Sequence, residues 1–161
     1  MRGGAEAYFY GSHTNRIDAK GRLATPAVFR RILNLDRVNA IYCIPSADEP
    51  CLDCGGFEFV ENLQAMIRRL DPYSPERRSL ELAVTAQTYV VSPDKEGRII
   101  LPQKLRDHAR LDGEAAFAGR GEFFQIWNPV DYEKVVAAAI KEAGAAKLGL
   151  RALSSNSGDA S

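Results

Sequence analysis

The chain has 161 residues, which suffices for one ordinary domain or two very small ones. Hydrophobic residues make up 45% and charged residues 26%, a composition typical of a globular protein with a buried core. The 21 basic and 21 acidic residues cancel, so the chain lacks the overall basic surplus that is usual in nucleic-acid-binding proteins.

Neither end of the sequence resembles a membrane anchor or a signal peptide. The longest apolar run near a terminus, Val135–Ile140, is far shorter than the roughly 20 residues that span a bilayer. The first six residues lack the apolar core of a signal peptide. We therefore expect a cytoplasmic protein with no membrane partner.

The first predicted elements are a strand, a tight turn and a return strand. Tyr8–Tyr10 are strand-type residues. Asp18 and Gly21 are spaced as in a turn, because Asp can accept hydrogen bonds from the backbone ahead of it and Gly adopts positive φ without strain. The return strand is expected at Leu23.

A short helix is predicted directly after this strand. Thr25 is the expected N-cap, and Pro26 suits the first helical position. Phe29, Ile32 and Leu33 would form one apolar face of the helix.

Two further helices are predicted in the middle of the chain. Residues 61–70 place apolar side chains at helical spacing, namely Leu63, Met66, Ile67 and Leu70. A second helix starts well at Ser74, an N-cap, with Pro75 in the first position.

The second half begins like the first, with a strand expected over 88–91, a turn at Asp94 and Gly97, and a return strand over 99–101. Its short helix follows Pro102 with a poorer cap. A last helix begins after Pro129 and has an apolar face, which we expect to pack on the body or to join a subunit interface.

The two turn segments are copies of one motif. Residues 18–30 match residues 94–106, with every match 76 positions apart, as Asp94 is from Asp18. Both segments are locally basic: 13–31 has five basic residues and one acidic residue, and 92–110 has five and three. The positive charge therefore gathers at the repeated motif, although the whole chain is neutral.

This pattern resembles the MraZ family. The similarity lies in Phe9-x-Gly11, the two Asp-x-x-Gly-Arg turns with their following Pro-x-x-apolar-Arg, and the run Ala118-Gly119-x-Gly121-x-Phe123-x-x-Ile126-Trp127. It covers about residues 8–132. The resemblance implies an α+β, mainly β fold, in which two swapped-hairpin AbrB-type modules form a pseudo-symmetric, β-barrel-like body with flanking helices.

The implied domain organisation has five parts. They are a first SpoVT-AbrB-like module over 8–55, a helical linker over 56–82, a second module over 83–130, a C-terminal helix over 131–153 and a disordered tail over 154–161.

The resemblance also implies a function. The protein would be a nucleoid-associated transcriptional regulator, expected to be a repressor, of the division and cell-wall gene cluster. It would act as a ring-like homo-oligomer on repeated elements of double-stranded promoter DNA, with no cofactor and no small-molecule substrate.

The expected DNA contacts come from the basic residues of the two turns. Arg can pair bidentately with guanine, and Lys offers a point charge to phosphate or base. The predicted DNA-binding residues are Lys20, Arg22, Arg16, Arg98 and Lys95, and the turn-forming residues are Asp18, Gly21, Asp94 and Gly97. Alternatively, Asp18 and Arg22 pair only to stabilise their turn, and Arg30 and Arg106 on the short helices pair with the turn aspartates.

The second turn departs from the first at one position, where Glu96 stands in place of Lys20. We therefore expect the second turn to bind phosphate less well.

Other functions find less support. The alternative class is an AbrB-fold, antitoxin-like module that binds a protein partner without specific DNA binding. Cys51-x-x-Cys54 with Cys43 would need a fourth ligand to hold zinc, so we expect no metal site. No hydrolase, phosphate-loop or metalloprotease motif is present, and we do not expect an enzyme.

Overall fold

The computed structural model describes residues 8–34 and 40–158. By its internal contacts the chain divides into two compact units, Met1–Pro129 and Val130–Ser161. The first unit contains all the strands and both repeated turns, and the second unit contains almost all of the C-terminal helix.

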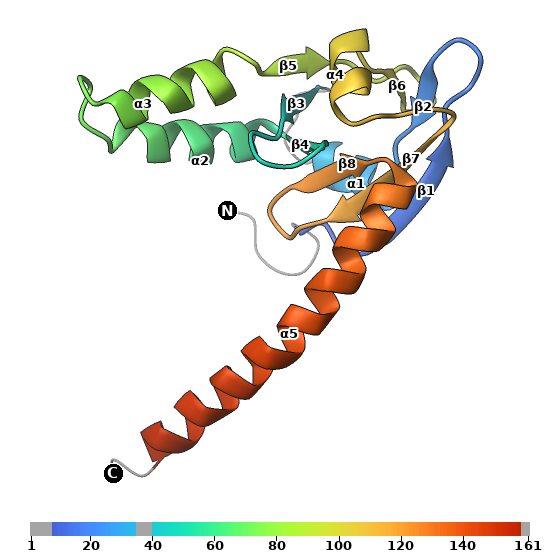
Figure 1. Cartoon of the computed structure of the whole chain (residues 1–161). Coiled ribbons are helices and arrows are strands. Elements are labelled where there is room, and N and C mark those ends of the chain that lie inside the picture. The colour runs from blue at the N-terminus through green and yellow to red at the C-terminus, as the bar shows by residue number, and fades with distance from the viewer. Residues whose placement is uncertain (1–7, 35–39, 159–161) are drawn as a thin grey trace. The chain divides into compact units, whose positions relative to one another are not determined.

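The first unit is built on an open antiparallel sheet of six strands, in the order β1-β7-β8-β4-β3-β5 (Figure 1). The strands are β1 Ser12–Arg16, β3 Ile41–Pro45, β4 Cys51–Gly55, β5 Tyr89–Val91, β7 Glu114–Gly119 and β8 Phe124–Trp127. With its helices this gives a mixed α and β fold with a mainly antiparallel sheet, as expected. Among the described strands no pairing closes the sheet, so the expected barrel-like closure is not observed.

A separate two-stranded ribbon joins the two repeats. β2, Arg22–Ala24, pairs antiparallel with β6, Arg98–Ile100. In this register Leu23 lies opposite Ile99, which is its match in the repeat. Each return strand therefore pairs with the return strand of the other repeat. With its own preceding segment β2 forms only an isolated bridge, Ile17 with Leu23, among the described residues.

Short helices follow both ribbon strands. α1, Ala27–Asn34, and α4, Gln103–His108, begin just after Pro26 and Pro102. The prediction that Thr25 caps α1 is wrong. Its backbone N–H continues the ribbon by donating to Gly97 O at 3.1 Å, and its buried hydroxyl has no hydrogen-bond partner among the described residues.

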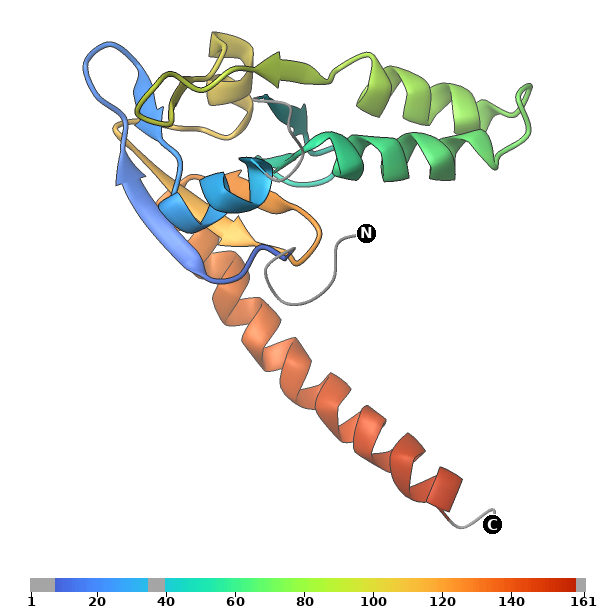
Figure 2. The same cartoon turned by 180° about the vertical axis from the view of Figure 1, so that it is seen from behind.

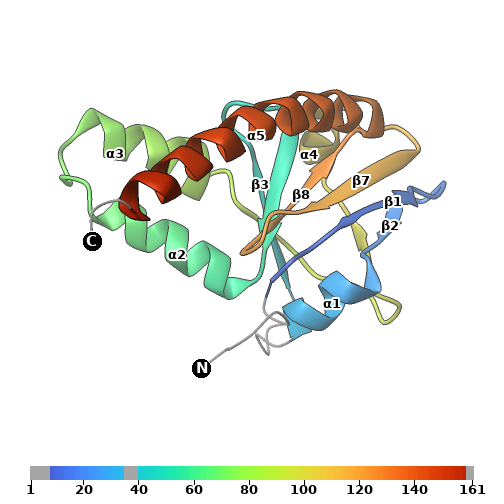
Figure 3. The same ribbon diagram turned by 90° about the horizontal axis from the view of Figure 1, so that it is seen from below.

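A helical hairpin connects the two halves of the first unit. α2, Phe57–Arg68, and α3, Pro75–Leu80, run side by side, and a π-helical turn over Glu81–Thr85 follows (Figure 3). The predicted start of α3 is confirmed, because the Ser74 hydroxyl accepts a hydrogen bond from Arg77 N at 3.2 Å. α2 begins four residues before the position that the apolar spacing suggests.

The second unit is a helix, α5, which begins at Pro129 and runs to Gly158. The helix predicted to begin after Pro129 is present and already includes Pro129, and it continues through residues 154–158, which we expected to be disordered. Residues 159–161 of that predicted tail lie outside the described residues. In the part of the chain that the structure describes, no helix has both the length and the apolar content to cross a membrane.

The first strand is also displaced from its predicted place. Tyr8–Tyr10 were expected to form it, but Phe9 makes only an isolated bridge with Gly121, and β1 is the polar segment that starts at Ser12. β1 is an edge strand whose exposed and half-buried residues alternate. Its pairing with β7, and not its own β propensity, holds it in the sheet.

Phe29 lies at the centre of the core. Its ring is fully buried and its centroid lies 5.2 Å from that of Phe9, 5.1 Å from Phe124 and 6.3 Å from Phe117. Through these contacts α1 covers the face of β7 and β8 (Figure 2). The predicted apolar face of α1 is confirmed, since Ile32 and Leu33 are buried as well.

We expect Phe29→Ala to lower the free energy of unfolding by about 3–5 kcal/mol, because it removes a fully buried ring and leaves a cavity. Urea-induced unfolding followed by circular dichroism measures the change. The matched control is Val28→Ala on the same helix, which is 44% exposed and should change the value by less than about 0.5 kcal/mol. Equal effects of the two substitutions would contradict this account of the core.

Candidate nucleic-acid interface

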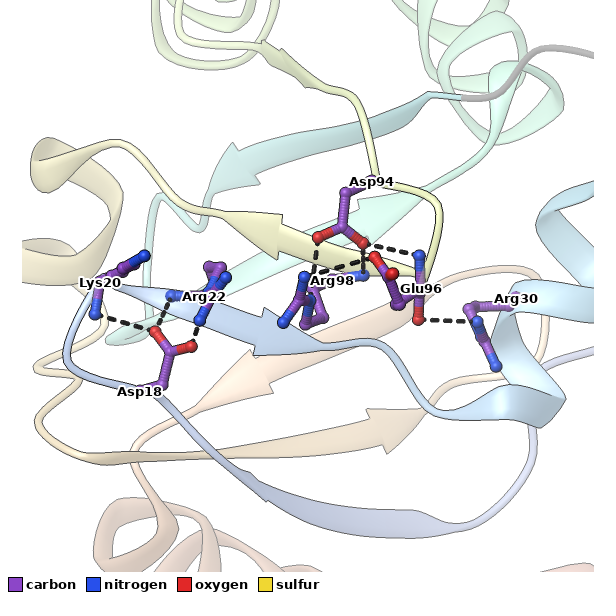
Figure 4. A network of polar contacts seen from close by, with 7 residues as sticks. All are labelled: Asp18, Lys20, Arg22, Arg30, Asp94, Glu96 and Arg98. Carbon is purple, nitrogen blue, oxygen red and sulfur yellow. Dashed lines mark hydrogen bonds and ion pairs between the residues drawn. The ribbon is translucent and has the colours of Figure 1, made fainter.

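The first turn is organised by the carboxylate of Asp18. Its Oδ1 accepts the backbone N–H groups of Lys20 and Arg22, both at 2.9 Å, and its Oδ2 accepts the Arg22 Nε at 2.6 Å (Figure 4). The main chain closes the turn with hydrogen bonds from Gly21 N to Asp18 O and from Asp18 N to Arg22 O. Asp18 therefore fixes both the backbone and the first part of the Arg22 side chain.

The second turn has the same architecture. Asp94 Oδ1 accepts the backbone N–H groups of Glu96 and Arg98, and Oδ2 accepts the Arg98 Nε, all at 2.9 Å. Gly97 has φ 77°, and Gly21 in the first turn has φ 78°. This left-handed conformation is why both turns need glycine at that position. The predicted turn-forming roles of Asp18, Gly21, Asp94 and Gly97 agree with this geometry.

The aspartate pKa values follow from these hydrogen bonds. The Arg22 backbone N–H, which donates to the carboxylate of Asp18, is the largest cause that holds the pKa of this carboxyl below its usual value. The Arg98 backbone N–H lowers the pKa of Asp94 in the same way. The hydrogen bond from Arg98 to Asp94 in turn raises the pKa of the Arg98 guanidinium. Both carboxylates therefore remain ionised and bound to the turn under ordinary conditions.

A helix of the other repeat lies against each turn, and in the second turn it also donates a hydrogen bond. The Arg30 Nη1 on α1 donates to the Glu96 carbonyl oxygen at 2.9 Å, and a Cβ added to Gly97 would overlap the Arg30 side chain. In the first turn a Cβ on Gly21 would lie 3.3 Å from the Arg106 Nη1 on α4. Arg30 therefore supports the second turn through a backbone carbonyl of that turn. The sequence had suggested instead that Arg30 pairs with a turn aspartate.

The other predicted DNA contacts lie around these turns. Arg16 is exposed at the end of edge strand β1, two residues before the first turn. Lys20 is exposed at the tip of the first turn. Lys95 is exposed in the second turn and lines a cavity of about 580 Å³ together with Arg30 and Arg31 of α1.

The ribbon sets the arrangement of these candidates. β2 and β6 are antiparallel, and each begins directly after its turn, so the two turns lie at opposite ends of the ribbon (Figure 4). Lys20 and Arg22 therefore share one end, and Lys95 and Arg98 share the other. The structure groups the predicted residues turn by turn and does not bring all five together.

A buried polar cluster at the centre of the sheet was not predicted from the sequence. Gln125 is 5% exposed; its Nε2 donates to Asp53 Oδ1 at 2.8 Å, and its Oε1 accepts from Arg120 and Trp127, both at 3.0 Å. Burial raises the pKa of Asp53 above its usual value. No motif in the sequence marks this cluster, because Asp53 reaches Gln125 only through the pairing of β4 with β8.

The three cysteines are free and buried. Cys43 and Cys54 lie opposite each other on β3 and β4, and burial raises the pKa of the Cys51 thiol to about 12. In the described part of the chain, no group of three or more His, Cys, Asp or Glu side chains could hold a metal ion.

The sequence of the chain is similar to those of one protein family. A family model described as "MraZ protein, putative antitoxin-like" matches residues 84–152. Curated relatives named "Transcriptional regulator MraZ" align with far more of the chain. Those of Rickettsia rickettsii and Rickettsia africae are 39% and 38% identical over 143 residues, which cover 89% of this chain and 96% of each relative. That of Rickettsia bellii is 39% identical over 137 residues, 85% of this chain and 91% of the relative.

The turn geometry makes a prediction for carboxyl titration. We expect Asp18 and Asp94 to titrate below the ordinary aspartate pKa of 3.8, so that the turn hydrogen bonds are complete above that pH and are lost as the pH falls through the lowered pKa values. Carbon-detected NMR of the side-chain carboxyl groups measures both midpoints.

Arg22→Ala supplies the internal comparison. It should raise the pKa of Asp18 only part of the way to 3.8, because the backbone N–H at position 22 still donates, and it should leave Asp94 unchanged. An Asp18 midpoint that does not respond to Arg22→Ala would count against the ion pair.

Proposed function

The chain belongs to the MraZ family of transcriptional regulators, which are not enzymes, and from this premise we propose that it is a sequence-specific DNA-binding regulator. In this proposal it represses the division and cell-wall gene cluster from repeated elements of double-stranded promoter DNA, as a ring-like homo-oligomer in the cytoplasm at the nucleoid. The observation that supports DNA binding best is the first turn, where an aspartate orients an arginine next to an exposed lysine.

The chemistry of Arg22 supports direct contact with bases. Asp18 engages the Nε, and among the described residues no acceptor is within hydrogen-bond distance of the two terminal nitrogens. Those nitrogens are the donors that pair bidentately with guanine O6 and N7 in the major groove. The carboxylate holds the side chain in place, which reduces the entropy lost on binding. Lys20 and Arg16 are placed to contact phosphates, and Lys95 and Arg98 are proposed contacts of the second turn.

We further propose that the two repeats are related by a local two-fold axis, as swapped-hairpin modules would be. Three registers support this arrangement. Leu23 pairs with its match Ile99; β1 of the first repeat pairs with β7 of the second, and β5 of the second pairs with β3 of the first. At the centre of the sheet, β4 pairs antiparallel with β8, and Asp53 lies opposite Gln125.

Self-association would supply the affinity that one turn lacks. The first turn, residues 18–22, has two basic residues and one acidic residue, so a single copy neutralises few phosphates. Several copies joined in one assembly raise the overall affinity through effective concentration. Large apolar side chains on the helical hairpin support an interface between subunits, since Met66 is 57%, Leu82 50% and Tyr73 96% exposed.

A second candidate function is an antitoxin-like module that binds a protein partner. It is favoured by the description of the matching family model, which includes the words "antitoxin-like". It predicts that the exposed turns contact no specific DNA.

DNA binding can be measured by fluorescence anisotropy, with labelled DNA from upstream of the protein's own gene over a salt series. We expect binding that weakens with salt, with a slope of log K against log salt of about −0.9 for each phosphate contact. Arg22→Ala should weaken binding by about 1–3 kcal/mol, roughly 5- to 150-fold, through loss of a bidentate base contact.

The matched control is Arg151→Ala, which removes an exposed arginine of α5, away from both turns in the sequence. It should bind like the wild type. Sedimentation velocity establishes that each variant keeps the wild-type assembly. If the wild-type assembly is intact and binds no DNA at low salt, the regulator proposal fails and the partner-binding module takes its place.

A further inference from the structure

The two turns share one backbone but differ at the third position, where Lys20 of the first turn is replaced by Glu96 in the second. We propose that Glu96 makes the turns unequal: it competes with DNA for Arg98 and weakens that contact, so that the Arg22 turn dominates DNA contact in each chain. This inference rests on the proposed function. It goes beyond the weaker phosphate binding expected from the sequence, because it gives Glu96 control over the contact that Arg98 makes.

The two arginines differ first in the number of donors that remain free. Arg98 uses its Nε for Asp94 at 2.9 Å and its Nη2 for the Glu96 Oε2 at 3.3 Å. Within the described residues, the Arg22 side chain donates only from its Nε, to Asp18. Bidentate recognition of guanine uses two N–H donors on one edge of the guanidinium. Glu96 takes one Nη2 N–H of Arg98 and so leaves three terminal N–H donors, whereas the four terminal N–H donors of Arg22 make no hydrogen bond to a described residue.

The two turns also differ in charge. Residues 18–22 contain two basic residues and one acidic residue, whereas residues 94–98 contain two of each, so the net charges of the two turns are +1 and 0. The Glu96 side chain is 66% exposed, which places a carboxylate where a phosphate would approach the turn. Like charges repel there, and repulsion between exposed charges weakens as salt is added.

The Glu96 side chain can be changed without loss of the contacts that hold the second turn. α1 holds this turn through the Glu96 carbonyl oxygen, which accepts from Arg30, and Asp94 holds it through backbone N–H groups. None of these contacts involves the Glu96 side chain. Its pair with Arg98 is exposed, and such pairs contribute little to stability. Substitutions at position 96 should therefore preserve the fold and alter only the exposed chemistry of the turn.

The experiment compares the two arginines before and after changes at Glu96, by anisotropy with the same promoter DNA. In the wild type we expect Arg98→Ala to weaken binding less than about twofold, against roughly 5- to 150-fold for Arg22→Ala. Glu96→Gln should strengthen binding modestly. Glu96→Lys, which restores the residue of the first turn, should strengthen it more, with a salt slope steeper by about 0.9 for each additional phosphate that the lysine neutralises.

A double substitution tests the mechanism directly. In the Glu96→Lys background, Arg98→Ala should now weaken binding well beyond its effect in the wild type, because Arg98 has become available. Sedimentation velocity and thermal unfolding check that each variant keeps its assembly and fold.

The outcomes separate this inference from the proposed function. Wild-type protein that binds no DNA overturns both. If the wild type binds and Arg98→Ala weakens it as much as Arg22→Ala does, the regulator remains and the inequality of the turns is wrong. Unchanged affinity and salt slope in Glu96→Lys would also overturn the role of Glu96.

Discussion

The pairing of Leu23 with Ile99 is the contact on which the placement of both turns depends. Both side chains are 1% exposed, and they join strands that belong to different repeats. A single repeat, such as residues 8–55, is too small to bury enough apolar surface to fold alone. Because each return strand completes its pairing in the other repeat, the two copies fold as one body. The antiparallel register then fixes the turns at opposite ends of the ribbon, where their basic residues face solvent.

The turn aspartates order each turn but also reduce its positive charge, and this limits how strongly a turn could attract DNA. Asp18 orders the backbone at two N–H groups and orients Arg22, but its own charge offsets half of the basic charge of the turn. Local order therefore comes with weaker long-range attraction to phosphate. A turn of this kind favours geometric recognition of a base over strong nonspecific binding, and it needs several copies to reach useful affinity. The zero net charge of the chain is consistent with recognition by several ordered turns and not by a strongly basic surface.

Local chemistry made parts of the molecule predictable. The Asp-x-x-Gly-Arg turns and the Ser74-Pro75 start of α3 follow from hydrogen bonds within a few residues. The misplaced features depend on distant partners. β1 is polar and is held by β7, which lies in the other half of the sequence, and Arg30 meets the Glu96 carbonyl across 66 positions. Aromatic content drew the strand prediction to Tyr8–Tyr10, whereas Phe9 is buried in the ring cluster around Phe29.

Because both repeats lie in one chain, corresponding positions of the two repeats can carry different residues. Two identical single-repeat chains that paired symmetrically could not differ in this way. In the proposed two-fold arrangement the last strands of the two repeats, β4 and β8, meet at the axis, where Asp53 lies opposite Gln125. Two aspartates there would repel each other in a half-buried site, whereas the amide donates to the carboxylate at 2.8 Å and accepts from two further donors. The same freedom lets Lys20 and Glu96 differ. A duplicated motif can thus keep one copy for contact with DNA while the other serves mainly to complete the fold.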